Sequence, residues 1–495
     1  MPAFIFKWSA ESIRGHRFWQ AMKARDPLLA AWQSTVSRKG DGAAVFDSMG
    51  KIARSFRDIE EGARAFYKKI DTFPAGAVVA VQIGNHQDWP SVFIASLRKQ
   101  LVVLPLDQSI SERQRDAALE ICQATAVVSA ATLAGEDVTG ETDLGIVRLT
   151  TAGSTVDWGD NPPSLLKLTS GTTAAPRAVR FRAHQLLADC NQICETMGIS
   201  DGDLNFGVIP ISHSYGFSNL LTPLIVRGVP MVVSRDRTPR AVLADLARTS
   251  ATVFPGTPVF YQAFCNLGDV PAQPKLRLCI SAGAPLSGAV AKKFFEKFKQ
   301  PIHSFYGASE CGGICYDQDG TTFDDGLVGR PMQRVEIEFM EPTASSSQIR
   351  VRSAAVSDGY FPEGDKQKLG NGVFVPDDLL AQHNSALTIV GRVSDVINVA
   401  GKKVNPAEIE AQLLRFKGVR QAVVFGRSTG AGLRNEEVAA CVQASPQTTE
   451  NDLLRFCRDF LSPWQVPKRI FIVGAIPTNE RGKMSRRDLA RRFSQ

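Results

Sequence analysis

The sequence predicts an α/β protein in which a large N-terminal part is followed by a small α+β module. Two observations lead to this prediction. Short β-forming runs alternate with helix-length segments through most of the chain, and the C-terminal part repeats strands and helices on a smaller scale. Such alternation is typical of parallel sheets covered by helices. A chain of 495 residues is long enough for two or three domains with cores of their own.

Composition excludes several classes of protein. With 44% hydrophobic and 22% charged residues, the chain is unlike a coiled coil, a collagen-like repeat or a largely disordered protein. No stretch approaches the ~18 apolar residues of a membrane-spanning helix, and the first residues lack the apolar core of a signal peptide. Nine cysteines without a CxxC pair predict free thiols. We therefore expect a cytoplasmic protein.

The alternation of strands and helices can be followed from residue 76. Residues 76–83 (GAVVAVQI) form a β-rich run that ends at the turn signal Gly84-Asn85. Asp88-Trp89-Pro90 then predicts a helix start, with the aspartate as cap and the proline in the first turn. Residues 101–106 (LVVLPL) predict the next strand, and strands of the same kind follow near residues 126, 208, 232 and 280.

The pattern changes after about residue 327, where short strands separated by turns predict a β-rich subregion. Beyond Arg392 the sequence predicts a strand pair, a helix over Pro406–Phe416, two strands, a helix over Asn451–Leu461 and a final strand. We place a linker at Arg392–Asp395. The expected domains are therefore residues 1–391 and residues 392–495.

Charge is concentrated in the C-terminal module. The chain has a net charge of +7, whereas residues 392–495 hold 18 Lys+Arg and 10 Asp+Glu, so that segment carries +8 and the remainder −1. A basic module can bind nucleic acid, a membrane surface or a polyphosphate ligand. Nucleic acid is disfavoured, because the basic residues are not interleaved with stacking aromatic residues.

One loop carries a pattern suited to polyphosphate. Leu165–Phe181 reads LLKLTSGTTAAPRAVRF, in which Thr169–Thr173 combine hydroxyl groups with the unshielded backbone N–H groups that phosphates need. The pattern is not a Walker P-loop, since GxxxxGK[ST] is absent. Taken alone, the segment could also be an ordinary turn.

Four further motifs follow this loop in order, and with it they resemble the adenylate-forming superfamily of acyl-CoA synthetases, peptide-synthetase adenylation domains and luciferases, the AMP-dependent synthetase and ligase family. The motifs are SFYGASE (Ser304–Glu310), GVFVPDDL (Gly372–Leu379), GRVSDVINVAGKKVNPAEIE (Gly391–Glu410) and PTNERGKMSRRDL (Pro477–Leu489). The resemblance covers nearly the whole chain. It implies an N-terminal domain of two doubly wound α/β subdomains plus a distorted β-barrel, and a small mobile C-terminal domain.

The resemblance also implies a reaction in two steps. A carboxylate attacks the α-phosphate of ATP, giving an acyl-adenylate and pyrophosphate, and a thiol then displaces AMP. By resemblance Glu310 binds Mg²⁺, Asp378 holds the ribose hydroxyls and Lys483 reaches the bond between the carboxylate and the α-phosphate. The implied catalytic residues are Thr173, His213, Glu310 and Lys483. The implied ATP- and AMP-binding residues are Thr169, Ser170, Gly171, Thr172, Thr173, Arg177, Ser281, Gly283, Ala284, Tyr306, Gly307, Ser309, Asp378, Arg392 and Lys483.

The acid site and the thiol path are also implied by resemblance. His213 matches a histidine at the entrance of the acid pocket, and none of the pocket residues is cationic, so we expect a fatty or aromatic monocarboxylate. The implied pocket residues are His213, Tyr215, Phe217, Ser218, Gly283, Gly307 and Ala308. Ser394 stands at the hinge position, and Gly401 matches the glycine that lines the pantetheine tunnel.

The chain departs from the family at several positions. In the phosphate loop Ala174, Arg177 and Ala178 replace Gly, Lys and Gly, and Pro376-Asp377 replace the Thr-Gly that precede the ribose aspartate. Ser309 replaces a threonine. Arginine keeps the charge of lysine with a different geometry, and alanine is strained wherever the loop needs a positive φ. We read the site as divergent but working.

Three alternatives remain open at this point. Coenzyme A is the favoured thiol, because the basic module suits a phosphorylated thiol and no carrier domain follows Gln495. The rivals are an enzyme that loads a separate phosphopantetheinyl carrier protein and a degenerate homologue that binds nucleotide without catalysis. A luciferase-like oxygenase is a more distant third. The expected cofactors are ATP, Mg²⁺ and coenzyme A, and a homodimer is compatible with the sequence.

Overall fold

The structure is a computed structural model that describes most of the chain in twelve ranges. These are residues 26–130, 144–149, 156–159, 161–169, 177–234, 236–341, 343, 346–383, 385–399, 402–428, 436–477 and 486–493. The chain forms two compact units. The N-terminal unit comprises Met1–Glu338 and Arg350–Val375, and the C-terminal unit comprises Phe339–Ile349 and Pro376–Gln495. The expected domain boundary at residue 391 stays a prediction.

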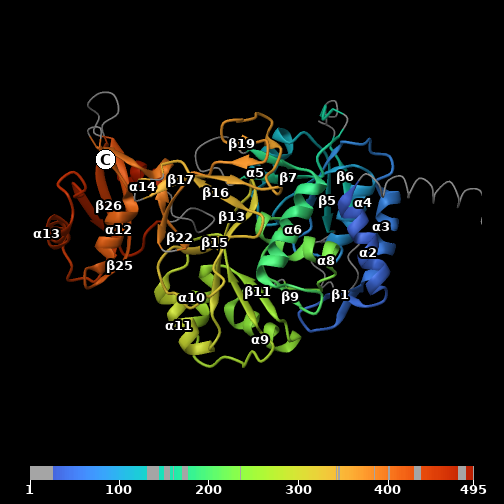
Figure 1. The fold of residues 1–495 in the computed structure, drawn as a ribbon, viewed down its shortest axis with the longest axis horizontal. Coiled ribbons are helices and arrows are strands. Elements are labelled where there is room, and N and C mark those ends of the chain that lie inside the picture. Colours follow the sequence, from blue (N-terminus) through green and yellow to red (C-terminus); the bar gives the residue numbers. More distant parts are fainter. Residues whose placement is uncertain are drawn as a thin grey trace, which may run out of the picture. The chain divides into compact units, whose positions relative to one another are not determined.

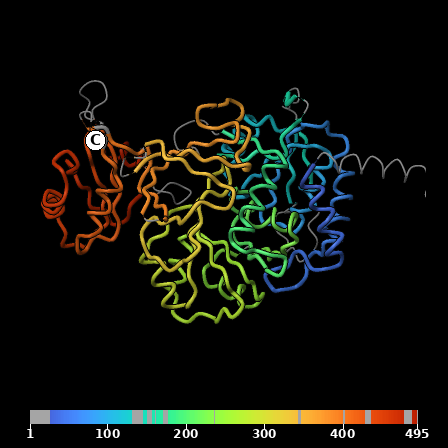
Figure 2. The backbone as a smooth tube through the Cα atoms, viewed as in Figure 1, coloured from blue at the N-terminus to red at the C-terminus, as the bar shows by residue number. Residues whose placement is uncertain are grey.

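The first sheet of the N-terminal unit has seven strands in the order β18-β8-β7-β4-β3-β5-β6. Their bounds are Gly359–Phe361, Ala178–Phe181, Leu165–Leu168, Val102–Pro105, Val78–Gln82, Ala124–Ala130 and Leu144–Arg148. The central pairs β3–β4, β3–β5 and β4–β7 are parallel, whereas β6, β8 and β18 run antiparallel to their neighbours. Strand β18 returns from late in the chain to pair with β8, and Figure 2 lets the reader follow this orange segment.

The second sheet of this unit follows the order β15-β14-β13-β12-β11-β9-β10-β1-β2. Their bounds are Leu327–Pro331, Gly312–Tyr316, Ile302–Ala308, Leu278–Ser281, Val253–Gly256, Asn205–Gly207, Met231–Val233, Ala43–Phe46 and Ile52–Ser55. The run from β13 to β1 is parallel throughout. The expected parallel sheets are therefore confirmed, with each predicted β-rich run forming a strand.

Helices cover these sheets. Their bounds are α2 Pro27–Lys39, α3 Phe56–Lys69, α4 Trp89–Arg98, α5 Glu112–Ile121, α6 Ala183–Met197, α7 Ser214–Gly216, α8 Thr222–Arg227, α9 Pro239–Thr249, α10 Pro258–Asn266 and α11 Gly288–Phe298, with a π-helical turn η1 over Phe217–Leu221. Helices α2, α3 and α4 lie beside one another (Figure 1). Asp88 stands at the N-cap of α4 as predicted, but its side chain does not cap the helix. It accepts instead from Arg54 Nε at 2.8 Å, because an ion pair competes successfully for the carboxylate.

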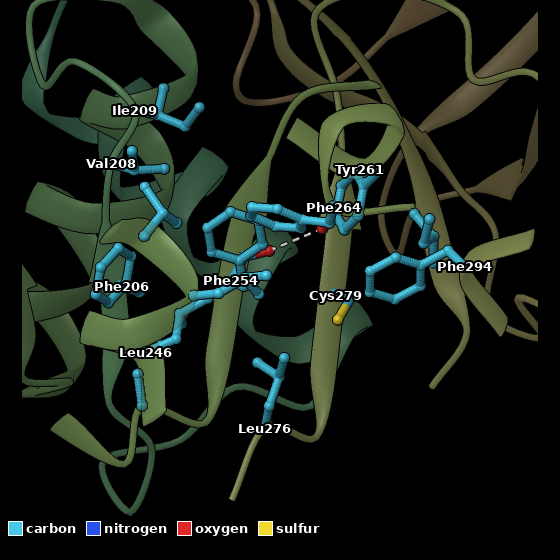
Figure 3. Packing of buried hydrophobic residues seen from close by; sticks show 14 of the residues in the cluster. Phe206, Val208, Ile209, Leu246, Phe254, Tyr261, Phe264, Leu276, Cys279 and Phe294 are labelled. Atoms are coloured by element: carbon cyan, nitrogen blue, oxygen red, sulfur yellow. Dashed lines mark hydrogen bonds between the residues drawn. The ribbon is translucent and has the colours of Figure 1, made fainter. Parts of the chain in front are cut away.

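Aromatic residues fill the core beneath the second sheet (Figure 3). Phe254 lies at its centre, with the rings of Tyr261 and Phe264 at centroid distances of 5.7 and 5.6 Å. The buried Tyr261 hydroxyl donates to the carbonyl oxygens of Phe254 and Ile280, at 3.2 and 2.9 Å. This core fixes the middle strands, whose C-terminal ends carry the residues discussed below.

The nine cysteines are all free thiols, and all are buried. Burial raises the pKa of Cys122 and of Cys279 to about 12. The free thiols expected from the sequence are therefore confirmed. Among the helices in the described ranges, none is both long enough and apolar enough to cross a bilayer. The cytoplasmic location and the homodimer stay predictions.

Short strands follow β15 along the chain, as the sequence predicts. They are β16 Glu336–Phe339, β17 Ser347–Arg352, β19 Leu369–Gly370, β20 Val373–Phe374, β21 Asp378–His383 and β22 Ala386–Arg392. Strands β21 and β22 form an antiparallel pair. A single 3₁₀ turn, η2 (Val393–Asp395), occupies the expected linker.

The rest of the C-terminal unit is an α+β module, as predicted. Its elements are β23 Ile397–Val399, β24 Lys402–Val404, α12 Pro406–Arg415, β25 Val419–Ser428, β26 Glu436–Ala444, α13 Glu450–Phe460, β27 Arg469–Ile472 and α14 Arg486–Arg492. Arg486 donates to Asp395 at 2.6 Å and to both oxygens of Glu410 at 2.8 and 2.9 Å. Helix α14 is thereby joined to η2 and α12 within this unit.

Candidate active site

The ends of two neighbouring parallel strands place several predicted nucleotide residues together. Strands β12 and β13 pair with Ser281 opposite Ser304, so the segments that follow both strands leave the sheet at the same edge. Gly283 has φ +87°, and open space surrounds the position that a Cβ atom would take. Gly283, Ala284 and Gly307 are exposed, whereas Tyr306 is buried. A positive φ and open space are what close approach of a ligand to the backbone requires.

The predicted phosphate loop connects two paired strands. Strands β7 and β8 form an antiparallel hairpin, with Leu168 opposite Ala178. At its base the Thr169 N–H donates to the Arg177 carbonyl at 2.8 Å, and Thr169 Oγ1 donates to the same carbonyl at 3.2 Å. Ser170, Gly171, Thr172, Thr173 and Ala174 lie outside the described residues. Both ends of the loop are therefore fixed by the sheet.

Glu310 lies in a group of three side chains from distant parts of the sequence. The Tyr360 hydroxyl donates to Glu310 Oε1 at 3.1 Å, and the Arg177 guanidinium lies over the Tyr360 ring at 5.6 Å from the centroid. The Ser357 N–H donates to the Glu310 carbonyl oxygen at 3.0 Å. Strand β18 brings Tyr360 here by pairing with β8, with Tyr360 opposite Val179. The group unites a carboxylate, a phenol and a cation beside the phosphate loop.

Tyr360 is a site residue that sequence reasoning missed. Its only local signal is an aromatic pair, Tyr360-Phe361, after the turn-forming Ser357-Asp358-Gly359. That pattern predicts a short strand but does not indicate which strand it pairs with or that Tyr360 contacts Glu310.

The donor set at Glu310 fits a magnesium ion. Mg²⁺ prefers hard oxygen ligands, and it is typically held by one or two carboxylates plus substrate phosphates and water. Glu310 is half-buried and oriented by Tyr360. Among the described residues, no group of three or more His, Cys, Asp or Glu side chains is suited to a metal.

His213 is paired with an aspartate that the sequence did not single out. His213 Nε2 lies 3.0 Å from Asp107 Oδ2. Asp107 lies two residues beyond the end of β4. The hydrogen bond from His213 lowers the pKa of Asp107 well below its usual value, against the opposing effect of burial. Beside His213, the Ser214 hydroxyl donates to Ser309 Oγ at 3.1 Å, so the predicted acid entrance adjoins the segment of Glu310.

Two of the other predicted acid-pocket residues, Phe217 and Ser218, are buried, whereas Tyr215 is half-buried. Tyr215 donates to the Ile280 carbonyl at 3.3 Å, and Phe217 is 1% exposed. Ser218 is also buried, and its hydroxyl donates to Asp189 Oδ2 at 2.6 Å. The assignment of these residues to an acid pocket stays a prediction, as does that of Ala308.

Ser218 belongs to a buried polar group that includes a lysine. Lys167 Nζ donates to Ser218 Oγ at 3.4 Å and lies 4.4 Å from the centroid of the Phe181 ring. Burial lowers the pKa of Lys167, whereas Asp189 opposes that effect. The other Asp189 oxygen accepts from the N–H of Gly313, which lies on β14 of the second sheet, at 3.0 Å. This charged group therefore lies directly behind the turn that follows Glu310.

In the C-terminal unit, two predicted nucleotide residues form an ion pair. Asp378 and Arg392 stand opposite each other at the open end of the β21–β22 hairpin, with Arg392 Nε 2.9 Å from Asp378 Oδ1. The Val393 N–H closes this end by donating to the Asp377 carbonyl at 2.7 Å. Ser394 lies in η2. Gly401 and Lys483 lie outside the described residues.

Two family models and several curated relatives match the chain. A family model described as AMP-binding enzyme matches residues 32–361, and one described as AMP-binding enzyme C-terminal domain matches residues 408–483. A probable CoA ligase of Humulus lupulus is 26% identical, over 84% of this chain and 87% of its own. The oxalate–CoA ligase of Arabidopsis thaliana is also 26% identical, over 94% of this chain and 98% of its own.

Solved structures show the same fold. ATP-bound MatB from Rhodopseudomonas palustris superposes with a TM-score of 0.81 at 20% identity, covering 94% of this chain and 98% of its own. The o-succinylbenzoate CoA synthetase of Bacillus subtilis gives a TM-score of 0.76 at 18% identity, covering 93% and 97%. Because the first family model spans more than half of the sequence, this chain belongs to the AMP-binding enzyme family, the adenylate-forming superfamily that its motifs resemble.

Proposed function

We propose that this chain is an acid–thiol ligase that activates a carboxylic acid with ATP and transfers the acyl group to coenzyme A. A carboxylate oxygen attacks the α-phosphate, the bond to the β-phosphate bridging oxygen breaks, and pyrophosphate leaves. The coenzyme A thiolate then attacks the acyl carbonyl, and AMP leaves with the electron pair of the broken bond. The observation that carries the proposal is the group of Arg177, Tyr360 and Glu310 beside the Thr169–Arg177 hairpin loop.

The N-terminal unit supplies groups suited to the pyrophosphate half of ATP. The loop between Thr169 and Arg177 carries hydroxyl and backbone N–H donors, and Arg177 adds a fixed cation at its end. Glu310 would hold Mg²⁺, which when bound neutralises charge on the phosphates. Tyr360 holds the Glu310 carboxylate through a hydrogen bond, so that this ligand is ordered before the nucleotide arrives.

The C-terminal unit supplies the remaining roles that we propose. Asp378 would bind the ribose hydroxyls, and its ion pair with Arg392 fixes the direction of its carboxylate. Lys483 would oppose the negative charge that develops where the substrate carboxylate meets the α-phosphate. Ser394 would serve as the hinge, and Gly401 would line the path of the thiol arm.

For the acid we propose a fatty or aromatic monocarboxylate, with His213 at the pocket entrance. The names of the relatives differ in their acids, so they do not narrow this choice. For the thiol we propose coenzyme A, supported by the +8 charge of the C-terminal module. A carrier protein is the second candidate, because the 3,4-dihydroxybenzoate–[aryl-carrier protein] ligase of Bacillus anthracis is 28% identical over 66% of this chain and 73% of its own.

The first half-reaction is tested by carboxylate-dependent exchange of labelled pyrophosphate into ATP. The panel holds short, medium and long fatty acids, substituted benzoates, and oxalate and malonate as dicarboxylate controls. Exchange with one class supports the proposal and identifies the acid. Absence of exchange with every acid, while ATP still binds by calorimetry, favours the degenerate homologue. The variant Ala174→Gly/Arg177→Lys then distinguishes a weakened phosphate loop from a lost activity.

The second half-reaction is tested with the accepted acid. Single-turnover thioester formation is measured with coenzyme A and, in parallel, with a phosphopantetheinylated carrier protein. A rate that is at least tenfold higher with coenzyme A supports the proposed acceptor. A preference for the carrier would reassign the enzyme to carrier loading and leave the adenylation step unaffected.

A further inference from the structure

The pair of Asp107 and His213 joins the two sheets of the N-terminal unit. Asp107 follows β4 of the first sheet, whereas His213 follows β9 of the second. Both residues lie beyond the C-terminal ends of parallel strands, which is where α/β folds assemble their binding sites. The 3.0 Å contact between Nε2 and Oδ2 therefore crosses from one sheet to the other.

The Asp107 carboxylate is ordered by more than the histidine. Its Oδ1 accepts from the Ser109 N–H at 2.8 Å and from Ser109 Oγ at 2.5 Å. Its Oδ2 accepts from Ser212 Oγ at 3.4 Å in addition to His213. The carboxylate is mostly shielded, with 19% of the side chain exposed, whereas 60% of the His213 side chain is exposed. A fixed carboxylate thus holds one edge of an otherwise exposed ring.

A second residue of the first sheet fixes the backbone that leads to His213. Asn85, which follows β3 and is buried, donates from Nδ2 to the carbonyl oxygens of Gly207 and Ile209, at 2.9 and 3.1 Å. Its Oδ1 accepts from the Ile211 N–H at 2.9 Å. These contacts bind the segment between β9 and α7 to the first sheet, independently of Asp107.

We infer that Asp107 is a positioning residue that orients His213 at the entrance of the acid site; this inference rests on the proposed function. The carboxylate accepts a hydrogen bond from Nε2, so in the neutral ring the proton stays on Nε2 and the Nδ1 edge points away from Asp107. Asn85 fixes the main chain and Asp107 fixes the ring. The acid then meets a ring of one orientation, without an ordering cost at binding.

The kinetic test is a double-mutant cycle on pyrophosphate exchange with Asp107→Asn, His213→Gln and the double variant. Asp107→Asn keeps the shape of the side chain and removes its charge. We expect the KM for the acid to rise roughly tenfold or more, as for loss of a charge-assisted hydrogen bond, with the KM for ATP within twofold. In the His213→Gln background, Asp107→Asn should have no further effect. Additive effects of the two substitutions would overturn the inference.

A matched control and a direct view of the ring complete the test. Asp201→Asn removes a surface carboxylate whose partner, Lys39 Nζ, lies at 2.9 Å, and it should leave both KM values unchanged. Ring ¹⁵N resonances are recorded on histidine-labelled protein, and His213 is assigned by its loss in His213→Gln. We expect the Nε2-protonated form in the unchanged protein and shifted His213 ring resonances in Asp107→Asn.

The two readouts separate the inference from the function on which it rests. Ring resonances that do not respond to Asp107→Asn overturn the positioning role, whatever the exchange assay shows. A protein that exchanges no pyrophosphate with any acid, although its ring responds, refutes the proposed function, and the role of Asp107 in acid binding falls with it.

Discussion

The phenol hydroxyl of Tyr360 donates to Oε1 of Glu310 across 3.1 Å, while the Arg177 guanidinium lies over the ring of the same tyrosine. Tyr360 thus contacts both the carboxylate proposed to hold magnesium and the residue that ends the phosphate loop. A hydrogen bond to a ligating carboxylate fixes its orientation and tunes its basicity. The pairing of β18 with β8 is what makes this contact possible.

Tyr360→Phe should raise the Mg²⁺ concentration needed for half-maximal pyrophosphate exchange by about tenfold, within the range typical of residues that support metal ligands. The phenylalanine ring can still pack against the Arg177 guanidinium, so the contact at the end of the phosphate loop is kept. The check is exchange measured against total Mg²⁺ at fixed ATP. Tyr316→Phe, which removes a hydroxyl elsewhere in the same unit, is the matched control. An unchanged Mg²⁺ profile would remove Tyr360 from the metal site.

Lys483→Ala should lower adenylation by roughly 10²–10³, because it removes the charge that we propose to act in the transition state. Thioester formation from supplied acyl-adenylate should remain largely intact. Lys468→Ala, which removes an exposed lysine from the same module, should leave both half-reactions unchanged. An equal fall in both half-reactions would contradict the assignment of Lys483 to the first step.

Asp378→Ala should weaken ATP binding by roughly tenfold or more, since it removes the proposed acceptor for two ribose hydroxyls and leaves Arg392 without this partner at 2.9 Å. The order of preference among acids should not change. ATP affinity is measured by calorimetry and acid preference by the exchange panel. A changed acid profile would show that Asp378 acts on the acid and not on the ribose.

Lys167 gives the stability of the protein a pH dependence of predictable sign. Burial lowers the pKa of Lys167 in the folded protein, so the unfolded chain binds more protons above that lowered pKa. The free energy of unfolding should therefore rise as pH increases towards the unfolded pKa of about 10.4. This rise should be steeper in the unchanged protein than in Lys167→Met. Urea unfolding of both proteins from pH 7 to pH 9.5 provides the measurement. Parallel pH dependences would refute a buried, titrating Lys167.

Local patterns predicted the elements well where periodicity or punctuation was clear. The run over residues 76–83 became β3, and the helix expected over Pro406–Phe416 became α12 with one residue fewer. The hydroxyl-rich loop after residue 168 stood out by its own residues, whereas its phosphate role and the ribose role of Asp378 came from the family resemblance. Such signals depend on residues that are close in sequence.

Contacts between distant segments were not predictable in this way. Tyr360 reaches Glu310 because β18 pairs with β8, and Asp107 reaches His213 because segments after strands of two different sheets meet. Lys167 stands in an apolar run, LLKL, which predicts a strand but not that Asp189 and Ser218 would surround its charge. At Asp88 the local cap signal was outcompeted by Arg54, a residue on another element.

Because all nine thiols are buried, the native protein should react little with thiol-directed labels. A thiol whose pKa is about 12 holds almost no nucleophilic thiolate at neutral pH, and a buried sulfur is closed to maleimides. One cysteine introduced on the surface of each unit would therefore be the chief target for a pair of fluorescent dyes. Energy transfer between the dyes would then test whether the C-terminal unit moves during the proposed half-reactions, without removal of any native cysteine.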